Sequence, residues 1–94
     1  MVIGSCRIEL YLPGMASLKD KRSVLKRVIH RLRREFNVSV AEVDYHDIWQ
    51  SAVLAVVTVS TDAAYAHGLL TRVVQWIEHH RLDVDLVDYE MEML

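Results

Sequence analysis

The 94-residue chain is predicted to fold as one α+β domain, with four strands and two helices in the order β-α-β-β-α-β. Three observations support this prediction. Apolar and polar residues alternate near both ends of the chain, as in half-buried strands. Two stretches repeat their apolar residues at helical spacing, and a valine-rich run lies between them. The length itself allows one hydrophobic core and not two.

The first strand and the first helix are separated by a Pro-Gly pair, which ends the strand. In residues 2–12, Cys6 and Ile8 begin an apolar series that alternates with polar residues. The apolar residues of 18–36 fall within a stripe of about 100° on the helical wheel, which predicts an amphipathic helix. Ser17, followed three residues later by a carboxylate, has the spacing of a capping box at the start of this helix.

The middle of the chain contains two predicted strands. Residues 38–43 are expected to form the second strand, and residues 44–47 a polar bend or hairpin loop. Residues 51–61 are almost continuously apolar and rich in valine, which favours a central strand with both faces covered.

The last third of the chain repeats the helix–strand order. Thr61 or Asp62 can cap a second helix that continues to about His80. Gly68 lies within this helix but outside its apolar stripe, where it costs about 1 kcal/mol relative to alanine and has no packing reason in the sequence. Alternating residues over 83–93 predict the fourth strand.

Two β-α-β halves with right-handed crossovers give a ferredoxin-like βαββαβ sandwich, in which both helices cover one face of a four-stranded antiparallel sheet. The first and third strands should be central, and the second and fourth should be edges. The third strand is apolar on both sides, so residue type alone does not decide which side meets the helices. We assign Leu54 and Val56 to the open face, beneath a partner or beneath long side chains such as Arg7 and Tyr11.

Charge is divided unevenly along the chain. Residues 1–36 carry nine basic and three acidic residues, whereas residues 37–94 carry two basic and ten acidic residues. A row of cations along a helix suits the phosphates of nucleic acid. The alternatives are a solvated helix face, or docking on an acidic protein surface, including the acidic half of a second copy in a homodimer. The candidate nucleic-acid-binding residues are Lys19, Lys21, Arg22, Lys26, Arg27 and Arg33.

A second candidate surface combines the polar bend, its aromatic residues and the open sheet face. Acid–base or metal chemistry at Asp44, His46 and Asp47 is a weaker hypothesis, because three potential ligands in one loop lack a second cluster. A plain polar loop anchored by Ile48 and Trp49 is the simpler interpretation. The candidate residues of the interaction surface are Asp47, Trp49, Gln50, Tyr11, Leu54 and Val56.

Several chemistries are not expected. The three glycines are far apart, so no glycine-rich phosphate loop is predicted, and the single cysteine, Cys6, excludes a cysteine cluster within one chain. We expect neither a metal, a cofactor nor a catalytic site. We expect no signal peptide, and the longest mainly apolar stretch, residues 52–59, is far shorter than the roughly 20 residues of a membrane span. A cytoplasmic protein is expected. The excess of arginine over lysine and the scarcity of Asn and Gln are typical of a heat-adapted source.

Three stretches resemble the signature segments of the YlxP-like bacterial proteins, a family of unknown function. They are SLKDKRSVLK at residues 17–26, Glu-Val-Asp at residues 42–44 and Asp-Ile-Trp-Gln at residues 47–50. The resemblance covers nearly the whole chain and implies a ferredoxin-like fold with no established enzyme activity or cofactor. Such proteins tend to be encoded beside translation and ribosome-maturation factors, which implies a link to RNA or the ribosome. The residues to which it points are Lys19, Lys21, Arg22 and Lys26 first, and Asp47, Trp49 and Gln50 second.

Overall fold

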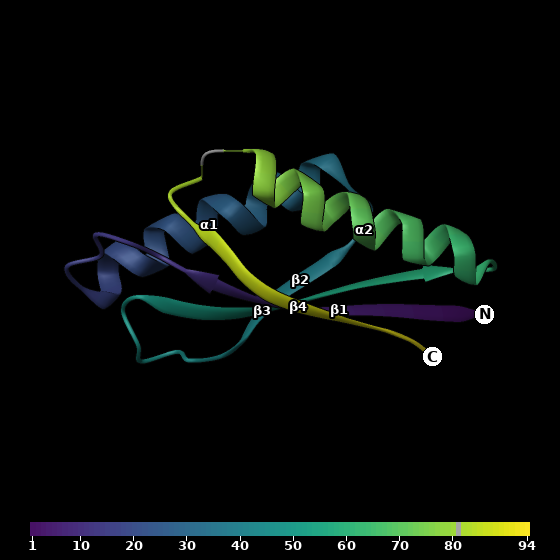
Figure 1. The fold of residues 1–94 in the computed structure, drawn as a ribbon, viewed down its shortest axis with the longest axis horizontal. Coiled ribbons are helices and arrows are strands. Elements are labelled where there is room, and N and C mark those ends of the chain that lie inside the picture. Colours follow the sequence, from purple (N-terminus) through teal and green to yellow (C-terminus); the bar gives the residue numbers. More distant parts are fainter. Residues whose placement is uncertain (81) are drawn as a thin grey trace.

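The computed structural model, which describes residues 1–80 and 82–94, follows the predicted order of elements. Its four strands form one antiparallel sheet in the order β2-β3-β1-β4, so the predicted central and edge strands are confirmed. Both helices lie on the same face of this sheet (Figure 1). The elements are β1 (Val2–Tyr11), α1 (Leu18–Glu35), β2 (Ser39–Asp44), β3 (Ser51–Ser60), α2 (Ala63–His79) and β4 (Asp85–Met93).

Both helices begin at the residues that the sequence indicates. The Ser17 hydroxyl accepts a hydrogen bond from the Asp20 backbone N–H at 3.1 Å. The Asp20 carboxylate accepts from the backbone N–H of Ala16 at 3.2 Å, one residue earlier than in the usual capping box. At α2, Asp62 rather than Thr61 is the cap, because its side chain accepts from the Ala64 N–H at 2.9 Å.

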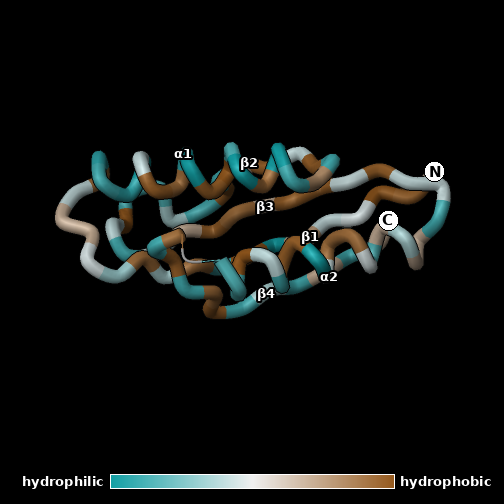
Figure 2. The backbone as a smooth tube through the Cα atoms, turned by 90° about the horizontal axis from the view of Figure 1, so that it is seen from above, coloured by the Kyte–Doolittle hydropathy of each residue, from teal (hydrophilic) through white to brown (hydrophobic). Residues whose placement is uncertain are grey.

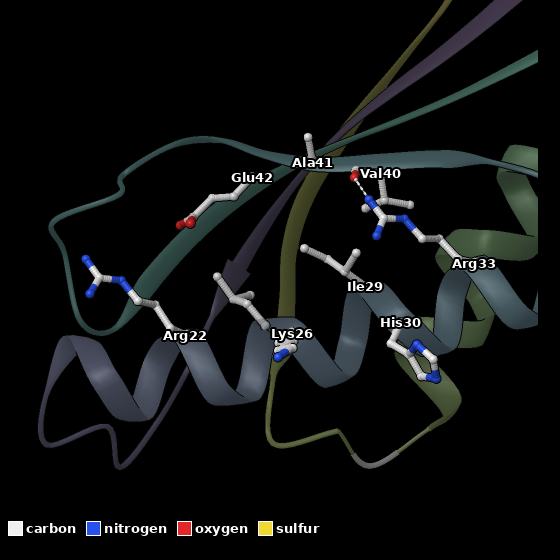
Figure 3. Close-up of a pocket in the computed structure, with 9 residues that line it drawn as sticks. Arg22, Lys26, Ile29, His30, Arg33, Val40, Ala41 and Glu42 are labelled. Carbon is white, nitrogen blue, oxygen red and sulfur yellow. Dashed lines mark hydrogen bonds between the residues drawn. The ribbon is translucent and has the colours of Figure 1, made fainter.

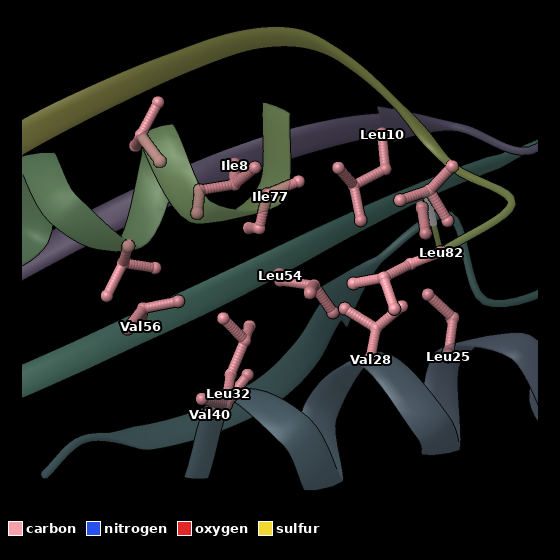
Figure 4. Packing of buried hydrophobic residues seen from close by; sticks show 14 of the residues in the cluster. Ile8, Leu10, Leu25, Val28, Leu32, Val40, Leu54, Val56, Ile77 and Leu82 are labelled. Carbon is pink, nitrogen blue, oxygen red and sulfur yellow. The ribbon is translucent and has the colours of Figure 1, made fainter. Parts of the chain in front are cut away.

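The core lies between the sheet and the two helices. Seen from above, α1 lies towards the β2 edge of the sheet and α2 towards the β4 edge, with hydrophobic stretches of β1 and β3 between them (Figure 2). Ile8 pairs with Leu54 and Cys6 pairs with Val56 in the β1–β3 register, so all four side chains point to the helices. Val28 of α1 is among the buried residues on the opposite side of this layer (Figure 4).

The assignment of Leu54 and Val56 to the open face is therefore wrong. Both side chains are fully buried in the core cluster. The sequence did not distinguish the two sides of β3 because both are apolar, and the decision comes from register with β1, whose apolar side is unambiguous.

Long polar side chains cover part of the open face of β3. Val53 lies there, opposite Glu9 and Asp44, and yet it is fully buried. The Arg7 guanidinium reaches from β1 across β3 to the Asp44 carboxylate, 3.3 Å away. A long amphipathic side chain that crosses a strand in this way can cover apolar residues beneath it, as predicted for Arg7. Tyr11 lies on the same face and is exposed.

Gly68 has no packing role in the structure. The nearest atom to a Cβ built there is Arg72 Nη1, at 3.7 Å, which is ordinary contact distance. Gly68→Ala should therefore stabilise the protein by about 0.5–1 kcal/mol and raise its melting temperature by about 4 °C in a circular-dichroism melt. Gly4→Ala is the contrasting variant, because a Cβ there would lie 3.1 Å from Leu70 Cδ1 and 3.3 Å from Ala66 Cβ. It should gain less stability than Gly68→Ala. A lower melting temperature for Gly68→Ala would contradict this interpretation.

Candidate nucleic-acid interface

A groove of about 460 Å³ lies between α1 and the edge strand β2 (Figure 3). Arg22, Lys26 and Arg33 form a basic row on α1, and this row lies beside the apolar stripe of the helix. When the stripe packs on the sheet, this row comes next to the sheet edge. The groove is lined by Arg22, Leu25, Lys26, Ile29, His30, Arg33, Val40, Ala41 and Glu42.

Three of the six predicted nucleic-acid-binding residues, Arg22, Lys26 and Arg33, come together in this groove. Arg22 and Lys26 are exposed, and neither has an ion-pair partner among the described residues. Arg33 is exposed but not free, since its Nη2 donates to the backbone carbonyl of Val40 at 2.8 Å. The structure thus places three cations along one side of a concave surface.

The outer edge of β2 is contacted by basic side chains. Arg33 holds the carbonyl of Val40, and His46 Nε2 lies 3.2 Å from the carbonyl of Glu42. Because backbone groups of alternate residues point to the same side of a strand, these two carbonyls mark the side that faces away from β3. The contacts protect an edge that would otherwise be open to another strand.

Lys21 is not part of this surface, and its assignment to nucleic-acid binding is wrong. Its side chain is 1% exposed. Its Nζ lies 3.0 Å from Glu42 Oε2 and donates to the Tyr45 carbonyl at 2.6 Å. The physical reason is helical phase: Lys21 stands three and four residues before Val24 and Leu25, on the buried side of α1. That spacing is the signal in the sequence that could have identified it.

Lys21 also positions the loop between β2 and β3. Tyr45, whose carbonyl it holds, has a φ of +61°, in the left-handed region that most residues avoid. A hydrogen bond from a buried ammonium group stabilises this turn. The loop is thereby attached to the first turns of α1, beside the groove.

The remaining basic candidates lie outside the groove lining. Lys19 is exposed near the start of α1. Arg27 lies 3.4 Å from the Asp83 carboxylate in a pair that is more than half exposed. An exposed pair of this kind contributes little to stability and is weakened by salt. Arg27 therefore lies on the side of α1 that faces Asp83, and not on the side that lines the groove.

The loop residues of the second candidate surface are exposed. Ile48 and Trp49 are each 45% exposed, so they anchor the loop less completely than we expected. Asp47 and Gln50 are also exposed, and the Gln50 carbonyl accepts from the Leu12 N–H at 2.8 Å.

The polar bend does not gather its possible ligands. Asp44 pairs with Arg7, whereas His46 contacts the Glu42 carbonyl. Within residues 1–80 and 82–94, no three His, Cys, Asp or Glu side chains are grouped as for a metal ion.

Cys6 has the surroundings of an unreactive thiol. It is fully buried, and burial raises the pKa of its thiol to about 11. At neutral pH the thiol is therefore protonated, and the thiolate is the reactive species. This agrees with its predicted role as a small hydrophobic residue.

The open sheet face is acidic. Glu9 on β1 pairs with Asp88 on β4, and the register places the carboxylates of β4 beyond Asp88 on this same face. Among the described residues that the register places there, Arg7 is the one cation. The acidic residues of this face are Glu9, Asp44, Asp85, Asp88, Glu90 and Glu92. The division of charge along the sequence therefore becomes a division between two faces of the molecule.

Comparison with known proteins gives a family and a fold. The model of a family described as "Protein of unknown function (DUF503)" matches residues 3–91. The chain is 36% identical over 77 residues to the uncharacterized protein YlxP of Bacillus subtilis, covering 82% of this chain and 84% of that protein. A de novo designed protein with a ferredoxin fold matches all of this chain and 84% of its own, with a TM-score of 0.56 and 13% identity. No helix among the described residues is long and apolar enough to span a membrane.

Proposed function

This chain belongs to the DUF503 family of proteins of unknown function, so we propose a function from the surface of the chain itself. We propose that it is a cytoplasmic module that binds RNA through the basic side of α1, which carries Arg22, Lys26 and Arg33. The observation that carries this proposal is the convergence of Arg22, Lys26 and Arg33 along one groove. The one carboxylate in the groove lining, Glu42, is paired with the buried ammonium group of Lys21. Its charge therefore offsets the field of the three cations only weakly.

The spacing of these cations suits a polyanion. Arg33 follows Arg22 by eleven positions, which corresponds to about 16 Å along the helix axis. A phosphate backbone lying along α1 can contact several cations over that length and release its condensed counterions. A single small anion would use only one or two of them. The resemblance to proteins encoded beside translation factors favours ribosomal RNA as the source of this polyanion.

The test is the salt dependence of RNA binding. Labelled single-stranded RNA of mixed sequence is titrated with the protein at several salt concentrations, and binding is followed by fluorescence anisotropy. Changing Arg22, Lys26 and Arg33 together to alanine should reduce the slope of log K against log salt by about 2, because each phosphate contact to a single strand contributes about 0.7. Affinity should fall by at least about tenfold.

The matched control removes the same charge elsewhere. Changing Arg31, Arg34 and Arg72 to alanine alters net charge equally, and these three residues are exposed, do not line the groove and are not among the candidate nucleic-acid-binding residues. This control should lose less affinity than the first triple variant. Equal losses in both variants, or a slope that neither variant changes, would contradict binding at this side of α1.

The acidic sheet face favours a second candidate function, protein interaction. Besides its carboxylates, this face carries Val59, which is 64% exposed. It suits a basic partner, and the basic side of α1 in a second copy has that character. Sedimentation velocity at high micromolar concentration should then show an oligomer that Glu90→Lys together with Glu92→Lys dissociates. A monomer at every concentration would exclude the homodimer.

A further inference from the structure

The groove between α1 and β2 has an apolar floor between its cations. Ile29 points from the helix towards the strand, between Lys26 and Arg33 (Figure 3). Leu25 and Val40 also line the groove but are almost fully buried, so the partly exposed Ile29 is the aliphatic side chain that a ligand would reach. A site for phosphate alone needs only cations and N–H donors. An apolar floor is an additional feature, and it suits a flat, uncharged group.

The dimensions of the groove fit such a group. Its volume of about 460 Å³ lies within the range of about 300–1,000 Å³ that is usual for small-molecule sites. One or two nucleobases can occupy such a space while the attached phosphates remain at the rim, beside Arg22 and Lys26. The guanidinium plane of Arg33 is a surface on which a base can stack.

The wall opposite α1 has hydrogen-bonding groups for a base edge. The outward carbonyl of Val40 accepts a hydrogen bond from Arg33 Nη2, and the outward carbonyl of Glu42 contacts His46 Nε2. Both contacts come from side chains at the surface, which can turn towards a ligand and leave the carbonyls as acceptors. Sequence-reading proteins that bind unpaired RNA combine these elements: an apolar or planar surface for the base face and polar groups for its edge.

From these three features we infer that the RNA bound at α1 is single-stranded, and that its unpaired bases enter the groove between α1 and β2. This inference rests on the proposed function and narrows it. A duplex can offer the groove its phosphates, 2′-hydroxyls and minor-groove base edges, but not the faces of its bases, which are stacked inside the helix. The contacts to Ile29 and to the edge of β2 would then be lost.

The experiment compares three labelled probes by fluorescence anisotropy at one salt concentration: ten-nucleotide single-stranded RNA, a ten-base-pair RNA duplex, and a ten-residue polyglutamate peptide. The single strand should bind about tenfold more tightly than the duplex, although the duplex carries more charge. Ile29→Ala should weaken single-strand binding about fivefold and duplex binding by less than about twofold. Ile29→Leu, the conservative control, should stay within about twofold of the wild type, and thermal melts verify that both variants fold.

Nuclear magnetic resonance locates the contact independently of affinity. Adding the single strand to the ¹⁵N-labelled protein should shift the backbone amide signals of Val40 and Glu42, and the duplex should leave them in place. Duplex binding that equals single-strand binding, or an unchanged affinity in Ile29→Ala, would overturn the inference. Equally tight binding of the acidic peptide would overturn it in favour of a peptide site.

RNA binding at α1 and the entry of unpaired bases into the groove can be contradicted separately. If the lysine and arginine triple variant loses affinity but duplex and single strand bind alike, the RNA-binding function stands and the groove inference is wrong. If neither RNA binds the wild-type protein, both are wrong.

Discussion

Lys21→Met is expected to lower the free energy of unfolding by about 3 kcal/mol, although it removes one charge from a chain with eleven Lys and Arg residues. The Lys21 ammonium group is 1% exposed and compensates the Glu42 carboxylate, whose side chain is only 20% exposed. Without it, Glu42 keeps a largely buried charge, and the Tyr45 carbonyl loses its donor. Urea denaturation followed by circular dichroism measures this loss.

A second substitution separates this mechanism from simple loss of packing. Replacing Glu42 by leucine in the Lys21→Met background removes the uncompensated carboxylate and leaves an apolar contact between α1 and β2. The double variant should recover most of the lost stability, because an apolar pair can replace a buried ion pair at little cost. If Lys21→Met costs less than about 1 kcal/mol, the pair does not hold α1 against β2 as we describe.

Leu54→Ala is the second substitution with a large expected effect, a loss of about 3 kcal/mol in unfolding free energy. Leu54 is fully buried in the core cluster, so its truncation leaves a cavity that the surrounding side chains fill only partly. Val59→Ala on the same strand is the matched control. Because Val59 is 64% exposed on the open face, its truncation should cost less than about 0.5 kcal/mol.

These two variants together test which side of β3 faces the helices. Equal losses for Leu54→Ala and Val59→Ala in the same denaturation experiment would contradict the β1–β3 register. A large loss for Val59→Ala alone would restore the first assignment, in which Leu54 belongs to the open face.

The order of the elements follows from local patterns, and the sequence was sufficient for it. The predicted ends differ from the observed ones by one or two residues, as at β2 (38–43 against Ser39–Asp44) and β4 (83–93 against Asp85–Met93). The capping side chains of Ser17 and Asp62 act within three residues of themselves, so neither needs a distant partner to be recognised. The alternation in β1 likewise identifies its buried side, because Cys6 and Ile8 stand between polar neighbours. The family resemblance and the ferredoxin-like fold rested on the same local information, and the comparisons confirm both.

The candidate site was only partly predictable. The sequence identified the basic character of α1, and three of its six candidate cations line the groove. The spacing of Lys21 from Val24 and Leu25 was a signal that it lies on the buried side of α1, but its positive charge favoured a surface position. Its partner, Glu42, is twenty-one residues away on another element, and no local pattern connects the two.

By itself, the sequence determined the α+β class, the succession of six elements, the cap of the first helix and the uneven distribution of charge. Only the tertiary structure decided which side of β3 is buried, where Lys21 lies, and that the basic row of α1 meets the edge of β2 in a groove. The physical reason is the range of the interactions involved. Helical periodicity and capping act over a few residues, whereas register and the Lys21–Glu42 pair join segments that only folding brings together.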